Sequence, residues 1–324
     1  MNLFSKKFEE IKIIIEKFKW PITFVFIFIM ILLPFMTNNY SIRMFSSIFM
    51  YASLGIAFNI MLGYIGYAAF GNVAFFGLSA YVTVILLNRT EIPLFIVFII
   101  AGLFSALYAI LLGMPLLRLR GHYFAIATLG IAEGTREIIS ILDKLTGGGK
   151  GISTPIIEIS VDGFYLIIYY SFLSLTFISL LACYFILNQP LGYAFRTIRG
   201  DEDAAAGVGI NTTYYKIVAW SISAFIAGIA GSIYVFWMGY IDPTMAFDGM
   251  INVKFTVIAL LGGLGTVIGP LVGAFLLELV SVVIWSLLLK IHLAVLGIVI
   301  ILIILFIPKG ILPFFKSERI GFKK

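Results

Sequence analysis

The sequence has little charge. Asp, Glu, Lys and Arg make up 12% of its 324 residues, while 61% are hydrophobic; soluble domains have roughly twice that charged share. This composition excludes a soluble enzyme and a disordered chain. A single cysteine, Cys183, excludes an intramolecular disulfide, and long apolar runs in place of short alternating segments exclude a porin-like barrel. The sequence therefore predicts an all-α, polytopic membrane protein.

Motifs for catalysis and cofactor binding are also missing. The segment Thr146–Gly151 (TGGGKG) has a lysine among glycines, but it lacks the first glycine and the final Ser or Thr of a phosphate-binding loop. The sequence has no H-E-x-x-H, G-x-S-x-G or C-x-x-C, and its two histidines, His122 and His292, lie far apart. We therefore predict no catalytic residue, no metal site and no cofactor in this chain. The net charge of +6 is attributed to basic cytoplasmic loops rather than to a nucleic-acid partner.

Apolar runs long enough to span a bilayer recur along the chain. A crossing needs about 20 apolar residues, and uncharged runs occupy residues 20–42, 44–88, 92–117, 163–195, 217–241, 255–277 and 291–308. Residues 122–142 form a further span with a polar outer half. Breaks are expected at Gly63–Gly66 and Gly262–Pro270, because Gly and Pro interrupt membrane helices where protein surrounds the backbone. We predict ten crossings, with eight as the alternative if the pair after residue 255 is re-entrant.

Basic residues orient these spans. Five lysines precede the first run and five basic residues follow the last, so both termini are predicted to be cytoplasmic. Residues 1–19 alternate charged and apolar side chains and predict a basic amphipathic segment on the cytoplasmic surface. Residues 20–308 form the transmembrane domain in this reading, and residues 309–324 form a cytoplasmic basic tail.

The longest charged cytoplasmic loop, residues 190–213, predicts a short helix. Its acidic residues precede alanines, which favour a helix, and the acids suit the positive end of the helix dipole. Gly207 and Gly209 then stop the helix. The product is a short, smooth helix that could enter a groove of another protein; a helical connector with acidic caps is the alternative.

This loop resembles the E-A-A…G loop of ABC importer permeases. More narrowly, the sequence resembles the permease subunits (LivM type) of branched-chain amino acid ABC importers. The matching stretches include residues 63–81, 119–129, 146–152, 214–234 and 259–270. The chain departs from the family in having Ala69 and Asn72 where members often have Ser and His, and Asp-Ala-Ala-Ala-Gly207 in place of the strict E-A-A order.

The resemblance implies the ABC importer permease fold and a translocation subunit of the cell membrane. Its partners would be a second homologous permease, an extracytoplasmic substrate-binding protein and two ATP-binding subunits, which hydrolyse the ATP. Branched-chain amino acids are the expected substrate; urea or amides are the alternative within the family. The residues expected to couple the ATPases through the 196–210 loop are Arg196, Arg199, Asp201, Glu202, Asp203, Ala204, Ala205, Ala206, Gly207 and Gly209.

Charged residues within the spans need a partner or a polar cavity. Glu278 lies in an apolar run, and Lys254 on the preceding segment is its expected partner. Glu133 and Arg136 can pair three residues apart on one helix. An ion-coupled secondary transporter, using Glu278 and Glu133, is the alternative from a different class. The candidates for a translocation path are Asn72, Ser79, Thr128, Glu133, Arg136 and Glu278.

Overall fold

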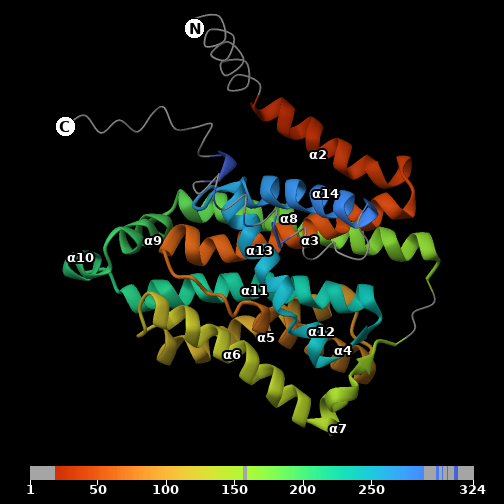
Figure 1. The fold of residues 1–324 in the computed structure, drawn as a ribbon, viewed down its shortest axis with the longest axis horizontal. Helices are drawn as coiled ribbons and strands as arrows, with labels where there is room; N and C mark the ends of the chain where they lie inside the picture. The colour runs from red at the N-terminus through yellow and green to blue at the C-terminus, as the bar shows by residue number, and fades with distance from the viewer. Residues whose placement is uncertain are drawn as a thin grey trace, which may run out of the picture.

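The computed structural model describes residues 19–155 and 159–287, together with 297–298, 301, 305 and 310–312. In this part of the chain, nearly all elements are helices, and most run along one common direction (Figure 1). The only sheet among these residues is a two-residue antiparallel ribbon. The predicted all-α, polytopic architecture is confirmed. Most of the predicted 1–19 segment and all but three residues of the 309–324 tail lie outside the described residues.

The elements follow one another with short connections. In chain order they are α2 (Lys19–Met36), α3 (Asn39–Asn59), the π-helix η1 (Ile60–Ile65), α4 (Val73–Arg89), α5 (Leu94–Leu116), α6 (His122–Ile141), α7 (Asp143–Thr146), the 3-10 turn η2 (Gly148–Lys150), β1 (Ile152–Ser153), α8 (Val161–Leu187), α9 (Pro190–Gly200), α10 (Glu202–Gly207), α11 (Thr212–Met238), β2 (Tyr240–Ile241), α12 (Pro243–Ala246), α13 (Gly249–Gly262) and α14 (Gly269–Leu287). The helices α9 and α10 lie at one end of the bundle, called the α10 end below (Figure 1). The ribbon lies at the opposite, β1–β2 end.

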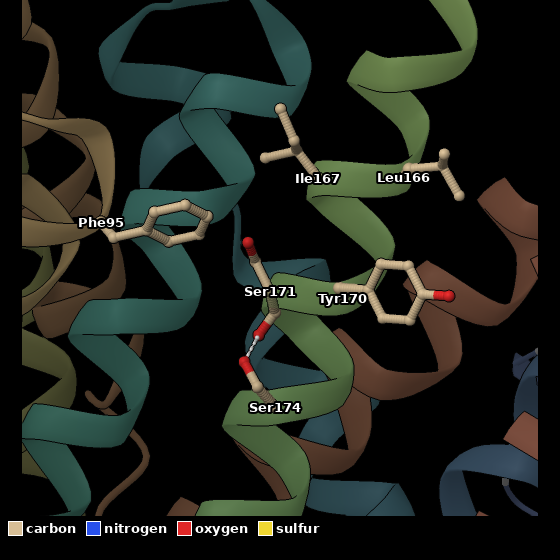
Figure 2. A pocket seen from close by; sticks show the side chains of 6 residues that line it. All are labelled: Phe95, Leu166, Ile167, Tyr170, Ser171 and Ser174. Atoms are coloured by element: carbon tan, nitrogen blue, oxygen red, sulfur yellow. Dashed lines mark hydrogen bonds between the residues drawn. The ribbon is translucent and has the colours of Figure 1, made fainter. Parts of the chain in front are cut away.

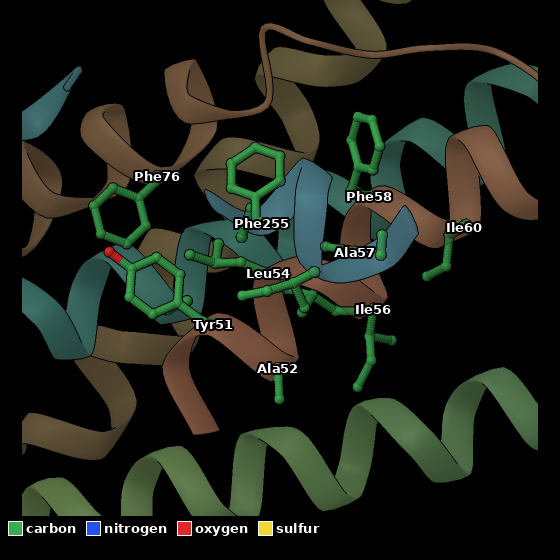
Figure 3. Close-up of a cluster of buried hydrophobic side chains, with 14 of the residues drawn as sticks. Tyr51, Ala52, Leu54, Ile56, Ala57, Phe58, Ile60, Phe76 and Phe255 are labelled. Carbon is green, nitrogen blue, oxygen red and sulfur yellow. The ribbon is translucent and has the colours of Figure 1, made fainter. Parts of the chain in front are cut away.

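The helix α3 is the centre of the bundle. Of the most apolar stretch of Asn39–Ile65, 94% is buried, with α8 and α14 packed against it on one side and α11 on another (Figure 1). Aromatic side chains fill the space around it: the rings of Phe58 and Phe255 lie 5.6 Å apart, and Phe76 lies beside the same cluster (Figure 3). The helix α3 is therefore part of the core of the bundle, and two of its serines and Asn59 are buried with its apolar residues.

Small and hydroxylated residues join α11 to α4. The Ser79 hydroxyl donates to the Gly228 carbonyl at 2.6 Å, and the hydroxyls of Thr83 and Ser232 share a hydrogen bond. Membrane helices associate through such close contacts and interhelical hydrogen bonds, because lipid gives no hydrophobic drive between them. The contact between these two helices is therefore sensitive to side-chain size.

Both predicted helix breaks are present. The helix α3 continues as η1 and ends at Gly66, whose φ of +90° requires glycine; the chain then runs without helix until the turn that opens α4. The second break separates α13 from α14, and there a Cβ on Gly262 would lie 1.8 Å from the Gly269 carbonyl oxygen. Only glycine fits this approach. Irregular backbone of this kind is tolerated in a membrane where protein encloses it.

Five helical stretches of the described chain are long and apolar enough to cross a membrane. They are Asn39–Ile65, Leu94–Leu116, Val161–Leu187, Thr212–Met238 and Pro243–Gly262, with the shorter apolar helices Val73–Arg89 and Gly269–Ile284. The predicted span at 122–142 forms the single helix α6 at the edge of the bundle (Figure 1). The number of crossings stays a prediction, since part of the C-terminal region lies outside the described residues.

Candidate functional site

The α10 end carries two consecutive helices, of which the sequence predicted the second. In α10, the Asp201 carboxylate caps the helix by accepting hydrogen bonds from the backbone N–H groups of Asp203 and Ala204, both at 2.9 Å. The chain turns away at Gly209, where φ is +88°. The helix α9 was missed. Its signal was Pro190 at the first turn and apolar residues spaced three or four apart, of which Phe195 and Ile198 are buried.

The tip of α10 is a smooth, exposed surface. Ala204, Ala206 and Gly207 are exposed, and Val208 is 75% exposed, whereas Ala205 is buried against the bundle. A Cβ added to Gly207 would meet nothing within 4 Å. Figure 1 shows α9 and α10 projecting from the end of the bundle. This surface has little side-chain bulk, which suits insertion into a groove.

Glu202, in contrast, points into the bundle. Its Oε1 accepts a hydrogen bond from Lys216 Nζ at 2.7 Å, and its Oε2 accepts one from the Tyr67 hydroxyl. The side chains of Lys216 and Glu202 are only 3% and 14% exposed. Burial raises the pKa of the Glu202 carboxyl, but the hydrogen bonds from Lys216 and Tyr67 outweigh burial and hold this pKa below its ordinary value. Glu202 therefore anchors α10 to the bundle, and the exposed tip of the helix consists of other residues.

This lowered pKa predicts a loss of stability in acid. Because the carboxyl pKa is lower in the folded state, its stabilisation is present above the ordinary value of 4.5 and is lost as the pH falls through the lowered value. The thermal midpoint of the purified chain should therefore fall below about pH 4.5, and Glu202→Gln should flatten this fall and lower the midpoint at pH 7. Thermal scans between pH 3 and pH 7 measure this fall of the midpoint.

The matched control is Glu91→Gln, an exposed site beyond α4. Equal acid profiles for Glu202→Gln and wild type would refute the assignment of the acid effect to Glu202.

A second ion pair lies on the surface of the same helix. The Arg120 guanidinium binds both carboxylate oxygens of Asp203, with Nη2 to Oδ1 at 2.9 Å and Nη1 to Oδ2 at 3.0 Å. This pairing lowers the pKa of the Asp203 carboxyl. The two side chains are 57% and 77% exposed, and exposed pairs add little stability. Sequence reasoning assigned neither Arg120 nor Lys216 to this helix, because Arg120 lies 83 residues before Asp203 and Lys216 lies 14 residues after Glu202.

The helix α9 reaches the first helix break. Arg199 donates from Nη1 to the Gly63 carbonyl, and the Asn59 side chain joins the two breaks by accepting from the Gly265 N–H and donating to the Thr266 carbonyl, both at 2.9 Å. Arg196, in contrast, donates back to the Leu187 carbonyl at the end of α8. The predicted loop residues therefore divide into anchors, such as Arg199 and Glu202, and an exposed tip.

Three of the residues predicted for a translocation path lie inside the helix packing. Asn72 donates to the Ser223 hydroxyl at 2.9 Å, Ser79 donates to a carbonyl of α11, and Thr128 donates to the Ala125 carbonyl at 2.8 Å. All three side chains are buried. The first two bonds reach α11, and the third lies within α6.

The charged candidates lie elsewhere and pair as the sequence predicted. Lys254 Nζ lies 3.1 Å from Glu278 Oε1, and Ser47 donates to Glu278 Oε2 at 3.1 Å. The Arg136 guanidinium pairs with Glu133, three residues before it on the exposed side of α6. The structure does not bring these two pairs together with the buried polar residues in one cavity.

None of these side chains lines the open pocket that lies between α5 and α8. It has a volume of about 390 Å³ and lies between Phe95 of α5 and one face of α8 (Figure 2). Its other lining residues are Leu166, Ile167, Tyr170, Ser171 and Ser174. No group of three metal-ligating side chains occurs in the part of the chain that the structure describes.

Comparison with known proteins identifies the family. Residues 40–304 match the family described as "Branched-chain amino acid transport system / permease component". The chain belongs to this family. The match takes in both helix breaks and the α9–α10 loop, so the features described above lie within the family's common region. This permease is thus a multi-pass membrane component of a transport system, and its relatives are transport subunits rather than enzymes.

Individual relatives agree with this assignment. The permease is 30% identical over 311 residues to the "High-affinity branched-chain amino acid transport system permease protein LivM" of Salmonella typhimurium, covering 88% of this chain and 73% of the relative. The LivM protein of Escherichia coli is 29% identical over 311 residues, which again cover 88% of this chain and 73% of the relative. The "Autoinducer 2 import system permease protein LsrC" of Yersinia pseudotuberculosis is 29% identical over 193 residues, 53% of this chain and 52% of the relative. No solved structure matches the permease.

Proposed function

We propose that this chain is the translocation subunit of an ATP-driven importer of branched-chain amino acids. Support for the substrate comes from the LivM relatives, which are named for this transport and align over most of this chain. The chain would pair with a second homologous permease and receive substrate from an extracytoplasmic binding protein. Energy would come from two separate ATP-binding subunits. The α10 end would face the cytoplasm, and both termini would lie there as well.

The observation that carries this proposal is the exposed tip of α10. Its alanines, Gly207 and Val208 form a low, uncharged surface, while the acidic residues of the same helix are engaged by Lys216 and Arg120. A protein surface is the natural cover for such a tip, because a helix six residues long gains little stability on its own. We propose that each ATP-binding subunit receives one such helix in a groove.

The test is a matched pair of substitutions. Gly207→Arg and Gly149→Arg place the same side chain in open space at opposite ends of the molecule, since neither glycine has an atom within 4 Å of an added Cβ. In membranes that contain the ATP-binding subunits, Gly207→Arg should reduce their co-purification with the tagged chain at least tenfold. Gly149→Arg should retain it.

Two results would contradict this proposal. Equal recovery of the ATP-binding subunits with both variants would remove the docking role of α10. Recovery of the wild-type chain without any ATP-binding subunit would remove the importer itself. Uptake of radiolabelled leucine, with urea as the competing probe, then distinguishes the two substrate classes.

A further inference from the structure

Lys216 is the most completely engaged charged residue at the α10 end. An ammonium group has three N–H donors, and the structure supplies three acceptors: Glu202 Oε1 at 2.7 Å, the Leu117 carbonyl at 2.7 Å and the Tyr67 hydroxyl at 3.2 Å. The residue is 2% exposed. These acceptors belong to α10, to the end of α5 and to the irregular segment after the first helix break. One side chain of α11 therefore holds three other parts of the molecule.

Aromatic contacts continue from this point into the bundle. The Tyr67 ring lies under Lys216 Nζ at 4.8 Å and packs edge-on against Phe124 at 5.2 Å. The rings of Phe124 and Trp220 lie 5.5 Å apart, and the Trp220 indole N–H donates to the Asn72 side-chain oxygen Oδ1 at 3.4 Å. Asn72 immediately precedes α4. A continuous packed series thus runs from the base of α10 to the start of a helix inside the bundle.

We propose that the Lys216–Glu202 ion pair transmits movement of α10 to α11 and to the segment after the first break. This inference rests on the proposed function, and it assigns Lys216 a role distinct from docking: Lys216 is a positioning residue and does not contact the ATP-binding subunit. Packed side chains and hydrogen bonds of this kind carry coupling when both ends belong to elements with two arrangements. When an ATP-binding subunit displaces α10, the buried pair obliges α11 to move with it.

The experiment separates docking from transmission. The complex of this chain with its second permease, ATP-binding subunits and binding protein is reconstituted in vesicles, and leucine uptake is measured per ATP hydrolysed. Lys216→Met should retain the ATP-binding subunits at the wild-type level while uptake per ATP falls at least tenfold. Lys150→Met, an exposed lysine at the β1–β2 end, should leave both quantities unchanged.

A double variant addresses loss of folding. Lys216→Met leaves Glu202 without its closest cation, which destabilises a buried pair more than removal of both charges does. Lys216→Met with Glu202→Gln should therefore regain most of the thermal stability that the single variant loses, yet it should still show the low uptake per ATP, because the connection remains absent.

Three results would overturn the inference. Restored uptake per ATP in the double variant would show that the lysine serves stability alone. Loss of the ATP-binding subunits from Lys216→Met, with their retention by wild type, would show that the pair shapes the docking surface. A wild-type complex without ATP-binding subunits would overturn the proposed function. This result is obtained with the wild-type chain, before any variant is compared.

Discussion

Gly231→Ala is expected to prevent correct packing of α11 against α4. A Cβ at Gly231 would lie 2.0 Å from the Phe76 carbonyl oxygen and 2.7 Å from its carbon, both backbone atoms of α4. Backbone cannot rotate away as a side chain can, so the helices must separate. Separation also lengthens the Ser79–Gly228 hydrogen bond. Overpacking costs about 3 kcal/mol at the upper end of the usual range, which should reduce the folded protein in membranes severalfold and lower its thermal midpoint.

The same substitution at Gly134 is the control. Gly134 lies within α6, and a Cβ there would meet nothing within 4 Å. Alanine favours a helix by up to about 1 kcal/mol over glycine, so Gly134→Ala should be at least as stable as wild type. Equal thermal midpoints for the two variants would show that α11 does not approach α4 as closely as the structure has it.

Breaking the Lys254–Glu278 pair should have a comparably large effect. Glu278→Leu leaves the ammonium of Lys254 within the bundle without its carboxylate partner, 4.7 Å from the Tyr51 ring. Removing one partner of a buried pair costs about 3 to 5 kcal/mol, because the other charge is left uncompensated. Lys254→Met should also destabilise the chain, since it leaves the buried Glu278 carboxylate with a hydrogen bond from the Ser47 hydroxyl but without its cation. Thermal unfolding in detergent measures both.

The double variant decides what the pair does. Lys254→Met with Glu278→Leu removes both charges and should recover most of the lost stability, as uncharged replacements of buried pairs do. If the pair serves folding alone, leucine uptake should return with stability. Recovered stability without uptake would instead place Glu278 in the translocation path or in ion coupling.

The spacing of apolar residues and the composition were sufficient to predict most of the helices and both helix breaks. The apolar runs located the helices, and the glycines at 63–66 and 262–269 located both breaks, because only a residue without a Cβ allows such backbone approach. The acidic start and glycine end of α10 were also evident, since capping is a local property. The Lys254–Glu278 pair followed from the cost of a lone charge in an apolar run.

Contacts between distant segments could not be predicted in the same way. Lys216 lies 149 residues from Tyr67 and 99 from Leu117, and nothing local in the sequence brings these residues together. From the sequence, Lys216 is only a basic residue directly before an uncharged run. Asn72 and Ser79 were named as candidates for a translocation path, and the hydrogen bonds that both make to α11 could not be read from the local sequence either.

The most direct test of the account uses two exposed valines. Val208, beside the tip of α10, is 75% exposed, and Val161, where α8 begins at the opposite end, is 67% exposed. A photoreactive amino acid at each position, activated in native membranes, would be followed by mass spectrometry of the cross-linked chains. We predict that position 208 captures a protein with a P-loop ATP-binding sequence and position 161 does not. Capture of that protein from position 161 but not from position 208 would contradict the assignment of α10 as the docking helix.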